Sequence, residues 1–140
     1  MGYSIDELYV GQTASSAKTI SETDVYLFAG ITGDFNPMHV NEEFARQTQF
    51  KGRIVHGMLS VGLFSGLMAM QLPGPGSIYL GQEIKFLKPV RIGDTITSTV
   101  TVIEIRKEKK IAKLETVCTN QNGETVVTGV ATTFIQSGTP

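Results

Sequence analysis

Cysteine and surplus charge are both scarce in this sequence. Cys118 is the single cysteine, so no internal disulfide can form, and a reducing compartment such as the cytoplasm is expected. The chain has 12 Lys and Arg against 13 Asp and Glu, a formal net charge of -1. Nucleic-acid binding and electrostatic attachment to a membrane normally need a basic excess, which is missing here. We therefore expect neither a nucleic-acid partner nor a membrane.

Long hydrophobic runs and a leader segment are also missing. Residues 1–7 contain neither the basic nor the apolar region of a signal peptide. The most apolar stretch, Met58 to Leu72, is too short for a membrane span and is diluted by Ser60 and Ser65. A chain of 140 residues can bury one core but hardly two. The sequence thus predicts a soluble, cytoplasmic protein with a single domain over residues 1–140.

Helix signals dominate the first half of the chain. Ser21 and Asp24 have the spacing of a capping box, which predicts a helix from there to about Gly33. Asn41 is placed to cap a second, short helix. Apolar residues lie all around the axis of residues 58–71, a pattern typical of a buried helix, and the Pro-Gly-Pro-Gly of residues 73–76 ends it.

Strand signals dominate the second half. Residues 77–87, 95–105, 111–119 and 124–135 read as strands, joined by a turn at 88–94, a charged hairpin tip at 106–110 and a hairpin turn at 122–123. Residues 12–20 add an early edge strand. We expect an α+β hot-dog domain, in which a four-strand antiparallel meander wraps around the long helix. One such sheet leaves an open edge and a bare helix flank, so we also expect a homodimer.

A carboxylate and a histidine frame an unusual loop in the first half. In residues 33–39, Gly-Asp-Phe-Asn-Pro-Met-His, Asp34 precedes His39 by five positions. On a continuous helix the two side chains would diverge by roughly 140°. Gly33 and Pro37 break the helix, and a broken loop can turn both side chains toward one cavity. There they form a natural pair for moving protons to and from a bound water.

Three blocks carry a family resemblance. Residues 33–39, residues 54–58 (Ile-Val-His-Gly-Met) and residues 76–82 (Gly-Ser-Ile-Tyr-Leu-Gly-Gln) resemble the MaoC-like (R)-specific enoyl-CoA hydratases, in order and with compatible spacing. The resemblance implies a homodimeric hot-dog lyase of fatty acid metabolism. Such an enzyme adds water reversibly to a trans-2-enoyl-CoA, gives an (R)-3-hydroxyacyl-CoA, and uses no metal or redox cofactor.

This reaction needs a base for the water that attacks C3, an acid for C2, and a donor for the thioester oxygen. We expect Asp34 to activate the water, and His39 to position it or relay its proton. Gly57 stands at the predicted start of the long helix, where free backbone N–H groups point outward. Its N–H fits the oxyanion donor, and a glycine lets the thioester approach closely.

Three further residues have roles that the resemblance implies for the substrate-binding region. Asn36 is expected to hold the loop through side-chain hydrogen bonds. Ser65 matches a position that lines the acyl pocket. Met68, three residues further along the helix, is expected to help limit the length of the acyl chain.

Each residue also has a simpler interpretation. Asp34 and His39 alone would fit an Asx turn and an exposed loop histidine. His56 is expected to tie down the loop before the helix, and Cys118 to be a core residue and not a nucleophile. Two histidines and one carboxylate lack convincing metal-ligand spacing.

A basic cluster beside the turn at 88–94 has two readings. Lys85, Lys88 and Arg91 form either a solvated face or a contact for the phosphates of coenzyme A.

Other function classes remain open at this stage. A hot-dog thioesterase would release free thiol, and a dehydratase acting on acyl carrier protein would need a basic docking patch. A non-catalytic acyl-CoA-binding domain would normally be fused to an output segment, for which this chain has no room.

Overall fold

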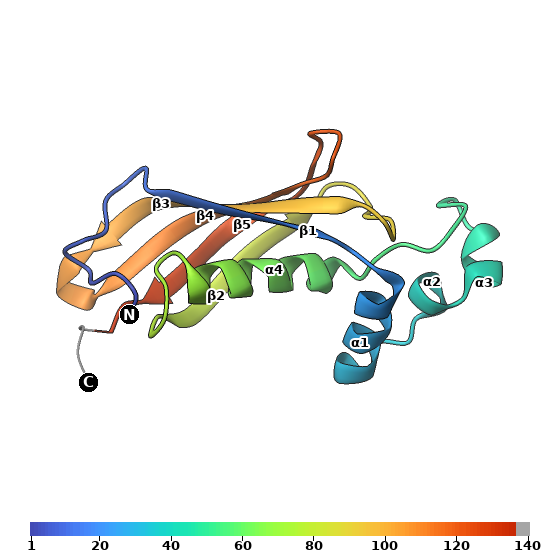
Figure 1. Ribbon diagram of the computed structural model, residues 1–140, viewed down its shortest axis with the longest axis horizontal. Coiled ribbons are helices and arrows are strands. Elements are labelled where there is room, and N and C mark those ends of the chain that lie inside the picture. The colour runs from blue at the N-terminus through green and yellow to red at the C-terminus, as the bar shows by residue number, and fades with distance from the viewer. Residues whose placement is uncertain (137–140) are drawn as a thin grey trace.

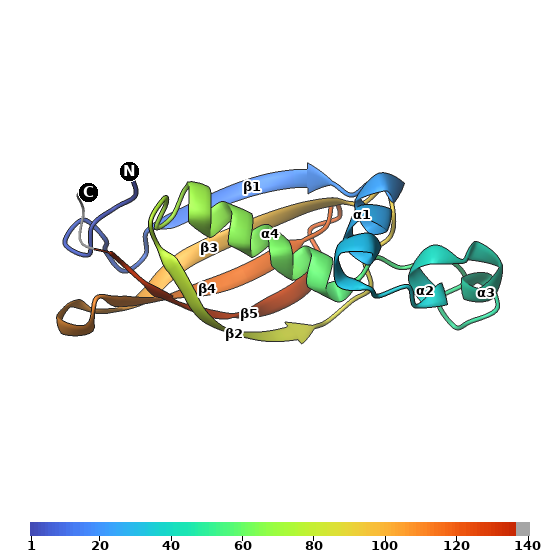
Figure 2. The same cartoon turned by 90° about the horizontal axis from the view of Figure 1, so that it is seen from below.

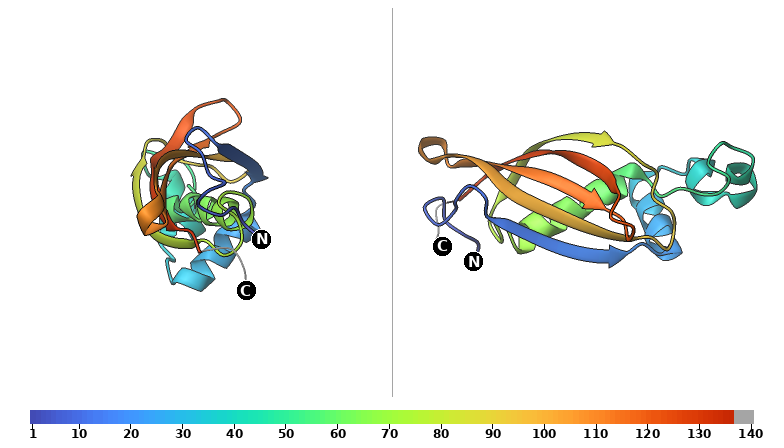
Figure 3. Two further views of the ribbon diagram at one scale, coloured as in Figure 1. Left: turned by 90° about the vertical axis from the view of Figure 1, so that its left-hand side faces the viewer. Right: turned by 90° about the horizontal axis from the view of Figure 1, so that it is seen from above.

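The computed structural model describes residues 1–136, and a single curled sheet dominates them. Its strands are all antiparallel and lie in the order β1-β3-β4-β5-β2. They wrap around one long helix, as the end-on view in Figure 3 shows. The strands are β1 (Thr13–Thr19), β2 (Ile78–Phe86), β3 (Thr95–Arg106), β4 (Ile111–Thr119) and β5 (Thr125–Phe134). This is the α+β hot-dog arrangement that the pattern predicts.

The helices divide into one central helix and a group of three at one end of the sheet (Figure 1). The central helix is α4 (Gly57–Met70). The terminal group comprises α1 (Glu22–Thr32), α2 (Pro37–Val40) and α3 (Glu42–Arg46), and a single 3-10 turn, η1 (Lys107–Lys109), lies in the β3–β4 hairpin. Within residues 1–136, no helix combines the length and apolarity that crossing a bilayer requires.

Local sequence sets the start of α1 as expected. The Ser21 hydroxyl accepts from the Asp24 N–H (3.1 Å), and the Asp24 carboxylate accepts from the Ser21 N–H (2.9 Å). Ile20 and Val25, on either side of the cap, are both fully buried. The predicted capping box is therefore confirmed, and it fixes the direction in which the chain leaves β1.

The expected four-strand meander is wrong in one respect. Only β3, β4 and β5 follow one another as neighbours, whereas β2 pairs with β5 at the far edge of the sheet. The segment 87–94 is therefore a crossing past the ends of β4 and β5, and not a hairpin turn. Neighbouring strand signals favour a hairpin, but here the sheet curls so that β1 and β2, its two edges, flank α4.

The core lies between the concave face of the sheet and one side of α4. Leu59, Phe64, Leu67 and Met68 are buried there against strand residues such as Val100. The opposite face is the bare flank that a single sheet was expected to leave, although apolar residues all around the axis are typical of a fully buried helix. It carries Met58, Gly62, Ser65, Gly66 and Ala69 in exposed or open positions. Figure 2 shows this side of α4 facing the viewer with no element over it. The described residues thus cover half of an apolar helix.

Candidate active site

The loop between α1 and α2 is built by three consecutive backbone devices. Gly33 adopts the left-handed conformation (φ 80°) and ends α1. Asp34 Oδ1 accepts from the Asn36 N–H (3.1 Å), and Asn36 Oδ1 in turn accepts from the Met38 N–H (3.0 Å), which caps α2. Pro37 occupies the first turn of α2, where its missing N–H costs nothing. The chain therefore reverses sharply, and the Asx turn coexists with the paired arrangement of Asp34 and His39.

This reversal brings the predicted acid and base face to face. His39 Nε2 lies 3.9 Å from Asp34 Oδ2. The separation is too long for a direct hydrogen bond, but a single water can bridge it with two contacts of roughly 2.8 Å. The Asp34 side chain is half exposed, whereas that of His39 is largely buried.

The orientation of the His39 ring is fixed from its other nitrogen. Nδ1 lies 2.8 Å from the carbonyl oxygen of Ile54. A carbonyl can only accept, so Nδ1 carries the proton in the neutral ring, and Nε2 is left as an acceptor facing Asp34. Both groups that face the gap therefore accept hydrogen bonds, which suits the two hydrogens of one water.

His56 supports the same pair from beneath. Its ring is almost fully buried and stacks on His39 with centroids 3.9 Å apart. His56 Nε2 donates to the backbone carbonyl of Asp34 (2.9 Å), while Nδ1 has no partner among the described residues. The histidine thus ties down the loop, as expected, and it does so at Asp34, the predicted catalytic carboxylate.

The same three side chains also lie close enough together to be considered as metal ligands. Asp34, His39 and His56 each place one ligand atom within 4.8 Å of the others. A metal ion must lie close to both ring planes, at about 2.0–2.1 Å from each nitrogen. Planes that stack 3.9 Å apart and are inclined by 29° do not meet within that distance. The geometry of this cluster therefore does not fit a shared metal ion.

A cavity of about 420 Å³ opens beside these residues. Its polar lining consists of Asp34, His39, His56, Ser60 and Lys88. The rest is mostly apolar, with Phe50, Ile54, Met58, Phe86, Leu87 and Val127 among its residues. Sequence reasoning did not single out Ser60 as a site residue. Its hydroxyl is completely buried without a partner among the described residues. A lone serine in an apolar helix gives no sequence signal that would distinguish it from a helix-thinning residue.

Gly57 also lines this cavity, at the first position of α4. No side chain caps α4 at this end. The backbone N–H groups of its first turn and the positive end of the helix dipole therefore lie beside the cavity. A Cβ at Gly57 would lie 2.6 Å from the Phe86 ring. Glycine is therefore needed for the close approach of α4 to β2.

The structure does not bring the three other candidate residues into the cavity. Asn36 is exposed and caps α2, which agrees with a loop-holding role. Met68 is buried in the core, and Ser65 lies on the uncovered face of α4. An acyl chain that contacts Ser65 must therefore run along that uncovered face.

The three residues of the basic cluster beside the crossing segment lie in different surroundings. Lys88 lies at the cavity and pairs with Glu124, and Arg91 donates to backbone carbonyls. Lys85 lies on β2.

The structure is thus a hot-dog domain with a carboxylate and a histidine facing each other beside an apolar cavity at the head of its central helix. Residues 10–127 match the model of the MaoC like domain, and the chain belongs to that family.

Relatives share this domain over most of their length. An (R)-specific enoyl-CoA hydratase of Rhodospirillum rubrum is 53% identical over 130 residues, covering 93% of this chain and 90% of the relative. A protein of the same description from Aeromonas caviae is 48% identical, covering 91% of this chain and 96% of the relative. The unliganded R-hydratase PhaJ1 of Pseudomonas aeruginosa superposes with a TM-score of 0.92 at 42% identity, covering 98% of this chain and 88% of that one.

Proposed function

We propose that this chain is a hydro-lyase that adds water reversibly to a trans-2-enoyl-CoA and forms an (R)-3-hydroxyacyl-CoA. The observation that carries the proposal is the Asp34–His39 pair, whose acceptor atoms face each other across 3.9 Å beside an apolar cavity. The relatives described as (R)-specific enoyl-CoA hydratases support the substrate class and the stereochemistry.

The arrangement suggests how the reaction proceeds. One water donates its two hydrogens to Asp34 Oδ2 and His39 Nε2, which leaves an oxygen lone pair free to attack C3. Asp34 takes the proton as the C–O bond forms, and the π electrons move through C2 onto the thioester oxygen. The Gly57 N–H donates to that oxygen. The enolate then collapses as C2 takes this same proton, which His39 Nε2 receives from Asp34 and passes on, so that H and OH have been added across the double bond and Asp34 is a carboxylate again. Each well-placed acid or base is typically worth ~10²–10⁴ in rate.

The chemistry asks for no metal or redox group. Hydration changes no oxidation state overall, and the polarisation that a metal would supply falls to the Gly57 N–H, a donor of a kind worth roughly 2.7–4 kcal/mol. We therefore propose that the enzyme needs no cofactor apart from the coenzyme A of its substrate.

We further propose that the enzyme is a cytoplasmic homodimer. Exposed apolar side chains gather on the edge strand β2 and next to it, including Ile78, Leu80, Phe86 and Leu87. The opposite edge, β1, is polar, and its hydroxyl groups bond to those of β3. An apolar open edge is a pairing site, so a second copy joined at β2 would extend the sheet.

The decisive assay adds purified protein to crotonyl-, hexenoyl- and octenoyl-CoA and follows the ultraviolet absorbance of the conjugated thioester. We expect the absorbance to fall and chiral analysis to find the (R)-alcohol, with no free thiol. Unchanged absorbance with all three substrates would exclude a hydratase. Release of thiol would indicate a thioesterase, and turnover only of acyl carrier protein thioesters would indicate a carrier-protein dehydratase.

A further inference from the structure

His39 depends on a segment of chain that is not part of its own helix. Residues 50–55 connect α3 to α4, and the Ile54 carbonyl accepts from His39 Nδ1. The Ile54 N–H donates to the carbonyl of Met38 (3.1 Å), and the Val55 N–H donates to that of Val90 (2.7 Å). The position of this segment therefore decides which nitrogen of His39 carries the proton.

Arg91 holds the segment from the side of the sheet. Its guanidinium donates to the carbonyl oxygens of Phe50 (2.5 Å), Gly52 (3.2 Å) and Arg53 (3.5 Å). Three carbonyls within four residues thus share one cation. Without the guanidinium, these three carbonyl groups would lose the donor toward which they point.

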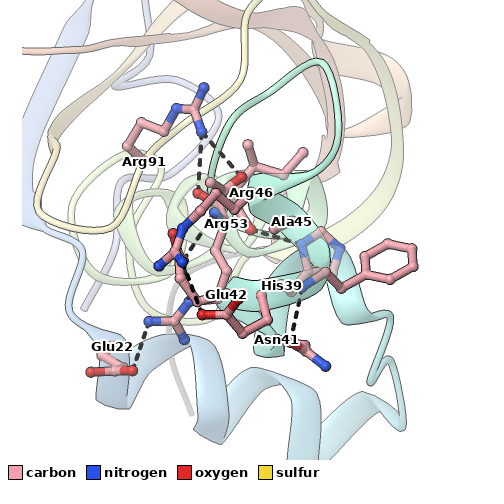
Figure 4. Close-up of polar contacts among 12 residues, drawn as sticks. Glu22, His39, Asn41, Glu42, Ala45, Arg46, Arg53 and Arg91 are labelled. Carbon is pink, nitrogen blue, oxygen red and sulfur yellow. Dashed lines mark hydrogen bonds and ion pairs between the residues drawn. The ribbon is translucent and has the colours of Figure 1, made fainter.

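Arg53 holds the segment from the side of the helices. Its guanidinium donates to Glu22 (2.8 Å) and the Tyr26 hydroxyl (2.9 Å) on α1, and to Glu42 (3.1 Å) on α3. Only 15% of the side chain is exposed, and the pKa of Arg53 is raised, mainly by its hydrogen bond to Glu22. Figure 4 shows Arg53 reaching Glu22 and Glu42, with Arg91 approaching from the side opposite Glu22.

We propose that Arg53 and Arg91 are positioning residues for His39. Together they fix the Ile54 carbonyl, which keeps the proton on Nδ1 and leaves Nε2 free to accept from the catalytic water. Arg53 also joins the segment to α1, which precedes the Asp34 loop, and to α3, the second helix after that loop. The consequence for rate rests on the function proposed above, whereas the consequence for the His39 tautomer does not.

The chain offers a matched control on α3. Arg46 pairs with Glu43 (2.9 Å) through a contact in which both side chains are well exposed. Arg46→Met removes the same charge as Arg53→Met, from a neighbouring position, without touching the segment. Because exposed pairs of this type contribute only about 0–1 kcal/mol, the control should behave as wild type.

Two measurements on the full chain test the proposal. With ¹⁵N-labelled histidine, long-range ¹H–¹⁵N spectra identify the tautomer of His39 directly. We expect the Nδ1–H form in the wild type and in Arg46→Met, and a mixture of tautomers in Arg53→Met and Arg91→Met. With crotonyl-CoA as substrate, a misplaced His39 should lower kcat about 10- to 100-fold with little change in KM. Arg53→Lys should restore part of the loss.

A pure Nδ1–H form with wild-type kcat in both arginine variants would overturn the proposal. So would a loss of kcat that merely matches a loss of folded protein. If Arg53→Met does not fold, Glu42→Gln weakens the same anchor with Arg53 in place, and the same two outcomes apply. If the wild type hydrates no enoyl-CoA, the proposed function fails, but the tautomer comparison still decides the positioning role.

Discussion

Asp34 performs two tasks with its two oxygens, and this division explains why sequence alone left two interpretations open. Oδ1 accepts from the Asn36 N–H and shapes the loop, while Oδ2 faces His39. The Asx turn and the facing arrangement of Asp34 and His39 are therefore both present. The loop could be predicted from Gly33, Asp34 and Pro37 because each acts on backbone close to itself. The role proposed for Arg53 could not, because its partners come from two distant segments, α1 and α3.

This division makes Asp34→Asn a sharp test. The asparagine oxygen can still accept from the Asn36 N–H, so the loop should keep its shape. An amide cannot take a proton from water, so hydration of crotonyl-CoA should fall by ~10²–10⁴. His39→Gln should cause a similar loss. Circular dichroism and thermal unfolding check that the fold is kept, and near-wild-type rates in either variant would refute the roles assigned here.

Gly57→Ala tests the head of α4. The added Cβ would lie 2.6 Å from the Phe86 ring, so that ring must move, and it lines the cavity. The ring is half exposed and has room to shift, so we expect the fold to survive. We expect kcat/KM for crotonyl-CoA to fall at least about tenfold, because a misplaced N–H donates poorly to the thioester oxygen. Gly62→Ala, where a Cβ meets nothing within 4 Å, is the matched control.

Cys118 provides a residue-scale prediction unrelated to catalysis. It is fully buried, and burial raises the pKa of its thiol to about 12. Only the thiolate reacts quickly, so an alkylating reagent at pH 8 should modify no thiol in the native protein and one in denaturant. Rapid labelling of the native protein would contradict its assignment to the core.

Features of the fold that depend on neighbouring residues were predicted correctly from the sequence. The order of the strands in the sheet, which depends on contacts between distant residues, was not. The capping box, the glycine end of α1 and the β3–β4 hairpin all follow from residues next to each other. The pairing of β2 with β5 joins positions about 50 residues apart, and no local signal distinguishes it from a β2–β3 hairpin. The bare flank of α4 agrees with the expectation that one sheet covers only part of the helix, although the uniform apolarity of α4 does not identify which face is bare.

The capping box gives a prediction at the start of α1. Ser21→Ala should lower the free energy of unfolding by about 0.5–2 kcal/mol, measured by urea denaturation. The pKa of Asp24 is lowered in the fold, mainly by the hydrogen bond from the Ser21 N–H. A lowered carboxyl pKa stabilises the fold above the ordinary value of 3.8 and stops doing so as pH falls through the lowered value. The stability difference between wild type and Asp24→Asn should therefore shrink as the pH falls from 3.8 to the lowered pKa, and a constant difference over that range would contradict the cause given.

For the whole molecule, the decisive feature is the unequal character of the two sheet edges. β1 is a row of short polar side chains, whereas β2 carries Ile78 and Leu80 in exposed positions next to the bare face of α4. A sheet that exposes one apolar edge buries it by pairing, so the proposed dimer should form at β2 and not at β1.

Leu80→Arg tests that assignment by placing a charge on the β2 edge. Light scattering coupled to size exclusion should give the mass of two chains for the wild type and of one chain for the variant at micromolar concentration. Ile103→Arg changes an equally apolar, exposed residue on β3, away from this edge, and should remain dimeric. A dimeric Leu80→Arg would move the interface to another surface, and a monomeric wild type would leave the apolar face of α4 without the partner that its composition predicts.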